Sequence, residues 1–183
     1  MFVRTRRLTL RPGWIEDAPA LAAAIGDARV VRNLARAPWP YGVADAEAFL
    51  AHEMPRDEPS LLIVARDDGA APIVGGIGVA RDDCGALELG YWLTPAYWGR
   101  GYATEAAIAL VASLRASFGT TALVSGHFVD NPASGRVLQR AGFTATGEVA
   151  PRWSAARGCA VDCVLYRWQA AVAPQAAFVP LAA

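Results

Sequence analysis

Two glycines lie two residues apart in the segment YWGRGYATEA, residues 97–106. The segment follows an apolar run typical of a strand and precedes an alanine-rich pattern with helical spacing. A helix N-terminus presents free backbone N–H groups and the positive end of the helix dipole, and glycine lets a ligand come close to the backbone. We therefore expect Gly99 and Gly101 to lie at a binding site for an anionic group.

Two common phosphate motifs do not fit this segment. A dinucleotide-binding fingerprint needs a third glycine, where this chain has Thr104, and an acidic residue about 20 residues later. A P-loop needs a lysine followed by serine or threonine after its last glycine, and Tyr102 stands there instead. Both mismatches argue against a nicotinamide cofactor or ATP as the ligand.

The strand before the glycines holds the sharpest catalytic candidate. Residues alternate between the two faces of a strand, so Glu88 shares a face with Gly90 and Trp92. The small Gly90 leaves room for a ligand, and a carboxylate beside it can accept a proton from an attacking ammonium. The same position also suits a carboxylate that binds the ammonium without taking its proton, or one on an ordinary solvated face.

The elements that must position these residues follow from the hydrophobic pattern. The sequence predicts six to seven strands: one within 3–12, two within 60–83 around a turn at Asp68-Gly69, and others at 86–93, 121–129, 143–149 and 160–169. It predicts about four helices, at 14–25, 45–54, 103–118 and 132–141, and an irregular connection over 27–44. We expect one α+β domain over 1–168 around a mixed, mostly antiparallel sheet, followed by a loosely ordered tail over 169–183.

Composition limits the classes of function. Apolar residues make up 54% of the 183 residues, which favours a packed domain, and the 17 basic and 17 acidic residues favour neither nucleic acid nor an anionic membrane as a partner. Apolar runs are too short for a membrane span. The cysteines at 84, 159 and 163 lack metal-ligand spacing, so we expect reduced thiols, no metal and a cytoplasmic location.

Several segments together resemble the GNAT acetyltransferases, in the branch that includes the ribosomal-protein N-terminal acetyltransferases. Residues 98–103, WGRGYA, are similar to the acyl-CoA loop of that family at its last two fixed positions, although Trp98 replaces the glutamine or arginine at the first. The segments RRLTLRP, LELGYWLTPAYWGRGYATEA, NPASGRVLQRAGF and VDCVLYRW are similar to family segments in the same order, and they cover roughly residues 4–168.

The resemblance implies a GNAT-like fold with acetyl-CoA as cosubstrate, held in a cleft where strands 86–93 and 121–129 splay apart. It places the pyrophosphate on the loop amides, and the pantetheine arm beside the backbone N–H of Leu93 or Thr94 and the side chain of Asn131. An asparagine before a proline is also an ordinary helix cap. The implied cofactor-binding residues are Leu93, Thr94, Gly99, Arg100, Gly101, Tyr102, Ala103, Thr104 and Asn131.

The resemblance also bears on the general acid. Many family members use a tyrosine in the helix that corresponds to 132–141, where this chain has Leu138, so Ser134 is the nearest hydroxyl. The leaving thiol has an ordinary pKa of about 8.5, so it needs little help from an acid. Glu88 and Ser134 are therefore the catalytic candidates, and His52 and His127 receive no role.

The implied function is an acetyl-CoA-dependent N-acetyltransferase acting on a primary amine, either a protein or peptide N-terminus or a small molecule. No cysteine has a base at suitable spacing, which favours direct transfer. Candidates for the acceptor pocket are Trp39, Tyr41, Trp92 and Trp153, although tryptophan more often serves packing. The alternative is a non-catalytic acyl-CoA-binding or sensing module on the same fold. A homodimer is a further expectation from the resemblance.

Overall fold

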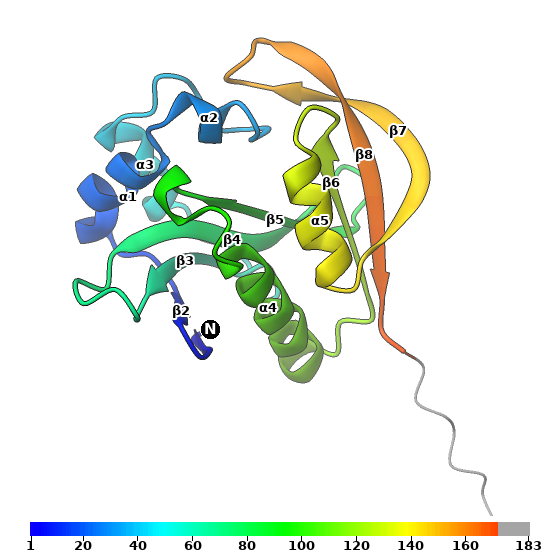
Figure 1. The fold of residues 1–183 in the computed structure, drawn as a ribbon, viewed down its shortest axis with the longest axis horizontal. Coiled ribbons are helices and arrows are strands. Elements are labelled where there is room, and N and C mark those ends of the chain that lie inside the picture. Colours follow the sequence, from blue (N-terminus) through cyan, green and yellow to red (C-terminus); the bar gives the residue numbers. More distant parts are fainter. Residues whose placement is uncertain (172–183) are drawn as a thin grey trace, which may run out of the picture.

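One mixed sheet runs through the molecule, a computed structural model that describes residues 1–171 (Figure 1). The strand order is β1-β2-β3-β4-β5-β6-β8-β7, and only the β5–β6 pair is parallel. The strands are β1 (Val3–Arg4), β2 (Leu8–Arg11), β3 (Ser60–Ala65), β4 (Ile73–Arg81), β5 (Leu87–Leu93), β6 (Ala122–Phe128), β7 (Thr144–Ser154) and β8 (Cys159–Gln169).

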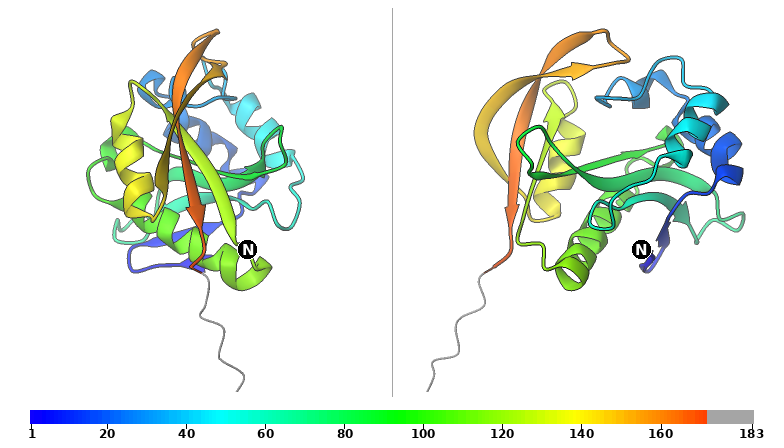
Figure 2. Two further views of the ribbon diagram at one scale, coloured as in Figure 1. Left: turned by 90° about the vertical axis from the view of Figure 1, so that its right-hand side faces the viewer. Right: turned by 180° about the vertical axis from the view of Figure 1, so that it is seen from behind.

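Helices cover both faces of this sheet (Figure 2). They are α1 (Ala18–Ile25), α2 (Ala28–Val31), α3 (Val43–Ala51), α4 (Tyr102–Phe118) and α5 (Pro132–Arg140), with short 3-10 turns at Ile15–Asp17 and Pro95–Tyr97. The first three helices pack on one face, and α4 and α5 pack on the other. Within residues 1–171, no helix combines the length and apolar character needed to cross a membrane.

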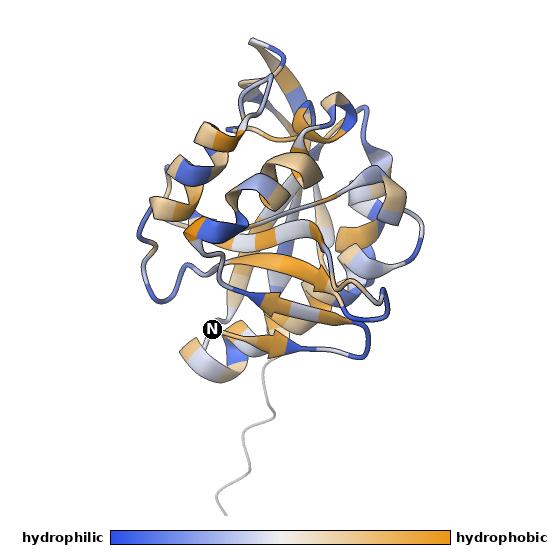
Figure 3. Ribbon diagram, turned by 90° about the vertical axis from the view of Figure 1, so that its left-hand side faces the viewer, coloured by the Kyte–Doolittle hydropathy of each residue, from blue (hydrophilic) through white to orange (hydrophobic). Residues whose placement is uncertain are grey.

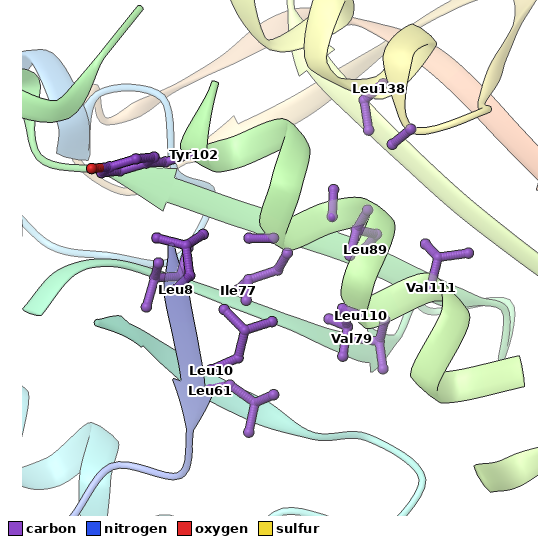
Figure 4. Packing of buried hydrophobic residues seen from close by; sticks show 14 of the residues in the cluster. Leu8, Leu10, Leu61, Ile77, Val79, Leu89, Tyr102, Leu110, Val111 and Leu138 are labelled. Atoms are coloured by element: carbon purple, nitrogen blue, oxygen red, sulfur yellow. The ribbon is translucent and has the colours of Figure 1, made fainter. Parts of the chain in front are cut away.

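The continuous apolar run LLIVA, residues 61–65 in β3, is explained by this double cover. Leu61 packs beneath α4 (Figure 4), and Ile63 belongs to the same cluster. Leu62 between them packs against α1 and α3 on the opposite face. Hydrophobic colouring accordingly follows the central strands between the two helical layers (Figure 3). A strand buried on both faces loses the polar alternation of a half-exposed strand.

The helix that follows the glycine loop is α4, and glycines bound it at both ends. Gly101 and Gly119 both have left-handed backbone angles, with φ of 78° and 66°. Between them, a helical stripe is buried against the sheet, formed by Ala106, Ala107, Leu110, Val111 and Leu114. The helix ends at Phe118 as predicted and begins at Tyr102, one residue before the predicted start.

The α+β fold with a mixed, mostly antiparallel sheet is confirmed, but the predicted numbers of elements were wrong. Residues 1–171 form a sheet of eight strands and five α-helices. The expected first strand is divided into β1 and β2 because the chain turns between them, where the Thr5 N–H donates to Leu8 O at 3.0 Å. The additional helix, α2, lies in the segment predicted to be irregular and begins where Asp27 accepts from Arg29 N at 2.8 Å.

The C-terminal hairpin is longer than the sequence predicted. The expected strand 143–149 continues as β7 to Ser154, so that β7 and β8 extend beyond β6. The tip of the hairpin curls toward α2 (Figure 1), where Ala155 N donates to Ala35 O at 2.9 Å. The domain boundary at residue 168 stays a prediction, and most of the expected tail lies outside the described residues.

Candidate active site

The sheet opens between β5 and β6. Their only register pair within residues 1–171 is Glu88 with Val124, whereas each strand pairs along its whole length with its outer neighbour. Just beyond this pair, the buried Ser125 hydroxyl donates to Leu89 O at 2.8 Å. The two strands diverge after this point, as expected for a splayed cleft.

The backbone of Leu93 faces this opening. The Thr94 N–H donates to Val74 O at 2.8 Å, so Thr94 lies in a hydrogen-bonded pair with β4. Alternation along an antiparallel ladder then turns the N–H and C=O of Leu93 away from β4 and toward β6. The Thr94 hydroxyl is also used within the fold, donating to Ala24 O at 2.8 Å. Of the two predicted backbone contacts, only the Leu93 N–H points toward the cleft.

The glycine loop lies between the end of β5 and the start of α4. Gly99 and Gly101 have φ of 74° and 78°, a region that side chains disfavour. A Cβ on Gly99 would meet no described atom within 4 Å, and one on Gly101 would meet only Arg7 Nη2, at 3.6 Å. Packing therefore does not require glycine at either position. The loop needs glycine for its backbone conformation, and it leaves open space above that backbone.

Free amides follow the loop at the start of α4. The first intrahelical bond near this end runs from Glu105 N to Gly101 O, at 3.0 Å. The N–H groups of Tyr102, Ala103 and Thr104 therefore have no intrahelical acceptor. A shallow hollow of about 530 Å³ lies beside them, bounded by α4, Thr5 and Arg140. Open glycine backbone, free amides and the helix dipole together suit an anionic ligand.

Two tyrosine side chains anchor the glycine loop to the segment after β3. The Tyr97 hydroxyl donates to Asp68 and the Tyr102 hydroxyl donates to Asp67, each at 2.6 Å. The two rings stack with centroids 6.0 Å apart, and Arg100 lies over Tyr97 at 5.0 Å. The side chain of Tyr102 is thus structural, and only its backbone N–H remains for a ligand.

Trp98 occupies the loop position at which the sequence departs from the family pattern. Its indole Nε1 donates to Leu93 O at 2.7 Å, which joins the loop to the end of β5. This bond uses the carbonyl of Leu93 and leaves its N–H for the cleft. Trp98 therefore acts as a brace in this structure.

Ser134 has a partner that the sequence did not indicate. Its Oγ lies 2.6 Å from the hydroxyl of Tyr91, which also lies 2.8 Å from Ser134 O. Tyr91 comes from β5 and Ser134 from α5, so the contact bridges the diverging halves of the sheet. Burial raises the pKa of Tyr91, despite the opposing hydrogen bond with Ser134. The sequence signal was only that Tyr91 shares the core face with Leu89 and Leu93.

Asn131 begins α5, and Pro132 follows at the first helical position. Within the described part of the chain, the Asn131 side chain makes no capping hydrogen bond, although its type and place suit a cap. Its partly buried amide is therefore not used to complete the helix.

Glu88 is paired with a residue from the far end of the sheet. Its carboxylate accepts a hydrogen bond from Arg152 of β7, and both side chains are partly exposed. In the sheet, β6 and β8 lie between β5 and β7, so this pair joins strands that are not neighbours. Nearby, burial raises the pKa of the Cys163 thiol. No sequence signal linked Arg152 to Glu88, since 64 residues separate them.

The four aromatic candidates for the acceptor pocket separate into two kinds. Tyr41 and Trp92 are partly buried and pack against the same clusters from α1 and α2. Trp92 lies over Gly76, where an added Cβ would come within 2.6 Å of its indole Nε1. Trp39 and Trp153 are 47% and 60% exposed. The first pair is part of the fold, and the second pair is free to contact a ligand.

A cluster of charged residues joins the β7–β8 turn to the ends of α2 and β6. Arg157 in the β7–β8 turn binds Asp130 with two nitrogens, at 2.8 and 3.0 Å, and Arg32 binds the same carboxylate at 2.9 Å. The hydrogen bond from Arg157 is the main cause that lowers the pKa of Asp130. Three segments that are distant in sequence thus meet at Asp130, which we call the Asp130 cluster.

His127 lies on β6 and packs against Gly135 of α5, whereas His52 follows α3. His127 Nδ1 is 2.9 Å from Phe128 O, and its ring lies 5.6 Å from that of Tyr166. His52 is an exposed residue at the end of α3. In residues 1–171, no group of three or more histidine, cysteine or acidic side chains is arranged to hold a metal ion.

Comparison with known families decides what this arrangement is. The family model for an acetyltransferase (GNAT) domain matches residues 7–144, which is more than half of the chain and includes the cleft, the glycine loop and α5. The chain belongs to the GNAT acetyltransferase family. Acetyl-CoA is the cosubstrate of this family, and the open glycine backbone with its free amides fits the phosphates of that molecule.

Solved structures share the fold of this GNAT protein over nearly its whole described length. A GNAT-family acetyltransferase from Bacillus anthracis is 20% identical, with a TM-score of 0.77 over 92% of this chain and 98% of that chain. RimL, a ribosomal alpha-N-protein acetyltransferase solved with coenzyme A, is 19% identical, with a TM-score of 0.78 over 92% and 98%. An acetyltransferase from Agrobacterium tumefaciens is 27% identical, with a TM-score of 0.70 over 93% and 95%. Among curated proteins, none matches this chain.

Proposed function

We propose that this GNAT protein moves the acetyl group of acetyl-CoA directly to a primary amine. The observation that carries the proposal is the divergence of β5 and β6 after Glu88, with the glycine loop at one side of the gap. Leu89 and Leu93 face α4, so the alternating Glu88 side chain lies on the opposite face of the sheet. The gap therefore connects an anion-binding surface to a carboxylate.

Backbone groups would hold the cosubstrate. We assign the pyrophosphate to the amides of residues 99–104, with the Arg100 guanidinium beside them. The Leu93 N–H is assigned to the thioester end because it points into the gap, whereas Thr94 is already bonded to Val74 and Ala24. The amide of Asn131 is assigned to the pantetheine arm because it is not used as a cap.

Glu88 is assigned as the group that accepts the proton of the amine. An ammonium has no lone pair with which to attack a carbonyl carbon, so it must lose a proton first, and a carboxylate can take it directly or through water. Arg152 holds the Glu88 carboxylate at the edge of the gap. The acceptor amine must reach this carboxylate beside or in place of Arg152.

Ser134 and Tyr91 are assigned to the leaving thiolate. Tyr91 has one hydroxyl hydrogen and two neighbouring acceptors, Ser134 O and Ser134 Oγ. When Tyr91 donates to Ser134 Oγ, the Ser134 hydrogen is free to point at the departing sulfur. The pair can therefore offer a hydrogen bond or a proton at the place where Leu138 removes the tyrosine used by many relatives.

The acceptor belongs to one of two classes, a peptide N-terminus or a small-molecule amine. Likeness to RimL supports the first class. Likeness to MccE, a microcin self-immunity acetyltransferase solved with acetyl-CoA and AMP, supports the second at 22% identity and a TM-score of 0.75, over 91% of this chain and 94% of that chain. Trp39 and Trp153 are assigned to the acceptor because both side chains are exposed. Free thiols at all three cysteines are consistent with the cytoplasmic location that we propose.

The test is a screen for free thiol released from acetyl-CoA, with peptides bearing free N-termini and small primary amines as acceptors. We expect release with at least one amine and none when that amine is already acetylated. Tight binding of CoA without release in either class would instead favour an acyl-CoA-binding module. The observation that favours such a non-catalytic module is the pairing of Glu88 with Arg152, because Arg152 occupies the carboxylate that is proposed as the base.

A further inference from the structure

The turn between β1 and β2 reaches the glycine loop through Arg7. Its Nη1 donates to Arg100 O at 2.8 Å, and its Nε and Nη2 both lie 2.7 Å from Glu105 Oε2. The Arg7 backbone N–H donates to Glu105 Oε1 at 2.9 Å, and the Thr5 hydroxyl donates to the same oxygen at 2.5 Å. The Arg7 guanidinium also lies over the ring of Tyr102, 4.5 Å from its centroid. One side chain thus joins the loop, the first turn of α4 and the N-terminal turn.

The bond to Arg100 O has a directional consequence. In a trans peptide unit the C=O and the N–H point in opposite directions. Because Arg7 holds Arg100 O, the N–H of Gly101 is turned to the other side of the loop. Glycines at 99 and 101 give this segment unusual rotational freedom, so a fixed carbonyl decides which way the amide faces.

The bonds to Glu105 have an electrostatic consequence. A free carboxylate in the first turn of α4 would repel a phosphate and would compete for the same amides. Here the carboxylate is already saturated by Thr5 and Arg7. Burial acts to raise the pKa of Glu105, but the hydrogen bonds from Thr5 and Arg7 outweigh burial and lower it. Glu105 is therefore an ionised anchor whose charge is matched by Arg7.

We propose that Arg7 is a positioning residue for acetyl-CoA: it aims the Gly101 N–H at the pyrophosphate and matches the charge of Glu105. This role rests on the proposed binding of acetyl-CoA at the loop. Arg7 uses its guanidinium nitrogens within the protein, so it acts through the loop rather than on the ligand. The N-terminal turn, far from α4 in sequence, thereby becomes part of the cosubstrate site.

Two acyl donors separate positioning from general damage. Acetyl-CoA carries the pyrophosphate, whereas acetyl-pantetheine has the same thioester and pantetheine arm without it. Arg7→Ala should lower kcat/KM for acetyl-CoA by about 10- to 100-fold relative to kcat/KM for acetyl-pantetheine. The Kd of CoA from calorimetry should rise by a similar factor. Arg7→Lys, which keeps the charge but not the fork, should give an intermediate loss.

Arg11 offers a matched control on the neighbouring strand. It makes a two-nitrogen ion pair with Asp17, at 2.7 and 2.8 Å, and lies over the ring of Trp14, but it does not contact the loop. Arg11→Ala should leave the ratio between the two donors and the Kd of CoA unchanged. Melting temperatures of both alanine variants show whether each is folded.

A charge-neutral double variant removes the remaining ambiguity. Loss of one positive charge near a phosphate weakens binding even without positioning. Arg7→Met combined with Glu105→Gln leaves the net charge unchanged, so a pure charge effect predicts normal binding and positioning predicts a persistent loss. Normal CoA affinity in this double variant, or in Arg7→Ala itself, overturns the role of Arg7. Loss of affinity in Gly101→Glu alongside normal affinity in Arg7→Ala would contradict only this role, whereas normal affinity in both would contradict the loop assignment itself.

Discussion

The two sides of the gap between β5 and β6 are built in different ways. On the α4 side, the proposed binding surface is mainly one continuous segment from Leu93 to Thr104, and most of its polar groups are backbone amides. On the opposite side, the charged groups are side chains from distant segments, as the Glu88–Arg152 and Asp130–Arg157 pairs show. A surface made from local backbone can be predicted from a short motif, whereas a surface made from long-range side-chain pairs needs the fold.

The largest expected effect comes from blocking the backbone surface. Gly101→Glu places bulk and negative charge on open, left-handed backbone where the phosphates are assigned. CoA binding should fall below detection in calorimetry. The matched control is Gly85→Glu, since Gly85 also has a positive φ, of 79°, with no described atom within 4 Å of an added Cβ. Equal CoA affinity in the two folded variants would remove the special role of the loop.

The second effect concerns the carboxylate on the other side. Glu88→Gln keeps the shape but removes the basicity, so kcat should fall by about 10²–10⁴-fold while the Kd of CoA stays constant. Activity should recover toward high pH, where the free amine no longer needs a base. Glu58→Gln is the control, because Glu58 also pairs with an arginine, Arg81, at 3.3 Å.

A different result at Glu88 would sharpen the comparison. If the KM of the amine rises while kcat is nearly intact, Glu88 binds the ammonium without taking its proton. A pH–rate profile that overlays that of the parent protein would exclude Glu88 from the mechanism. The Glu88 side of the gap would then bind the amine without taking its proton, and neither side of the gap would supply a base.

The contact that joins the two halves should have a smaller effect. Tyr91→Phe removes the hydroxyl beside Ser134 but keeps the ring in the core, and we expect kcat to fall about tenfold with little change in the Kd of CoA. A double-mutant cycle with Ser134→Ala gives the control. If Tyr91 acts through Ser134, the double variant should be no slower than Ser134→Ala alone. Multiplied losses would mean that the two hydroxyls act separately.

The smallest effect is expected at the Asp130 cluster. Asp130→Asn weakens exposed ion pairs to Arg157 and Arg32, so the KM of the amine should rise about two- to fivefold without a change in CoA binding. Asp57→Asn is the control, since Asp57 pairs with Arg81 at 2.8 Å and is similarly exposed. An equal loss for both ligands would show that the cluster supports the whole fold rather than the acceptor side.

The pH dependence of stability at this cluster has a definite sign. The pKa of Asp130 is lowered below its ordinary value of 3.8, mainly by the hydrogen bond from Arg157. A carboxylate with a lowered pKa stabilises the fold above that ordinary value, and the contribution is lost as the pH falls through the lowered pKa. Melting temperatures of the parent protein and Asp130→Asn should therefore differ near neutral pH and converge below pH 3.8.

Local signals were sufficient for much of the fold. The glycines at 101 and 119 marked both ends of α4, Asn131 and Pro132 marked the start of α5, and alternation placed Glu88 opposite the core face of β5. Each of these signals depends on backbone conformation within a few residues. The family resemblance added the splayed cleft, which no local pattern contains.

Two of the errors arose where distant residues decide local structure. The first strand divides at a turn that is held by Thr5 and Arg7 through Glu105, about one hundred residues away in sequence. The β7–β8 hairpin extends to a tip that contacts the α2 region through Ala35. The pairings of Arg152, Tyr91 and Asp130 could not be predicted for the same reason: their partners lie on other elements, and only the fold brings them together.

The single register pair between β5 and β6 has a thermodynamic consequence. The sheet therefore consists of two parts, β1 to β5 and β6 to β8, that are joined by one register pair. A molecule bound along both β5 and β6 would add contacts between these two parts. A ligand that binds only the joined, folded form adds a free energy of RT ln(1 + [L]/Kd), about 2.7 kcal/mol at one hundred times Kd. The cosubstrate would then link the two parts of the sheet reversibly, and the melting temperature of the protein would rise with the concentration of cosubstrate.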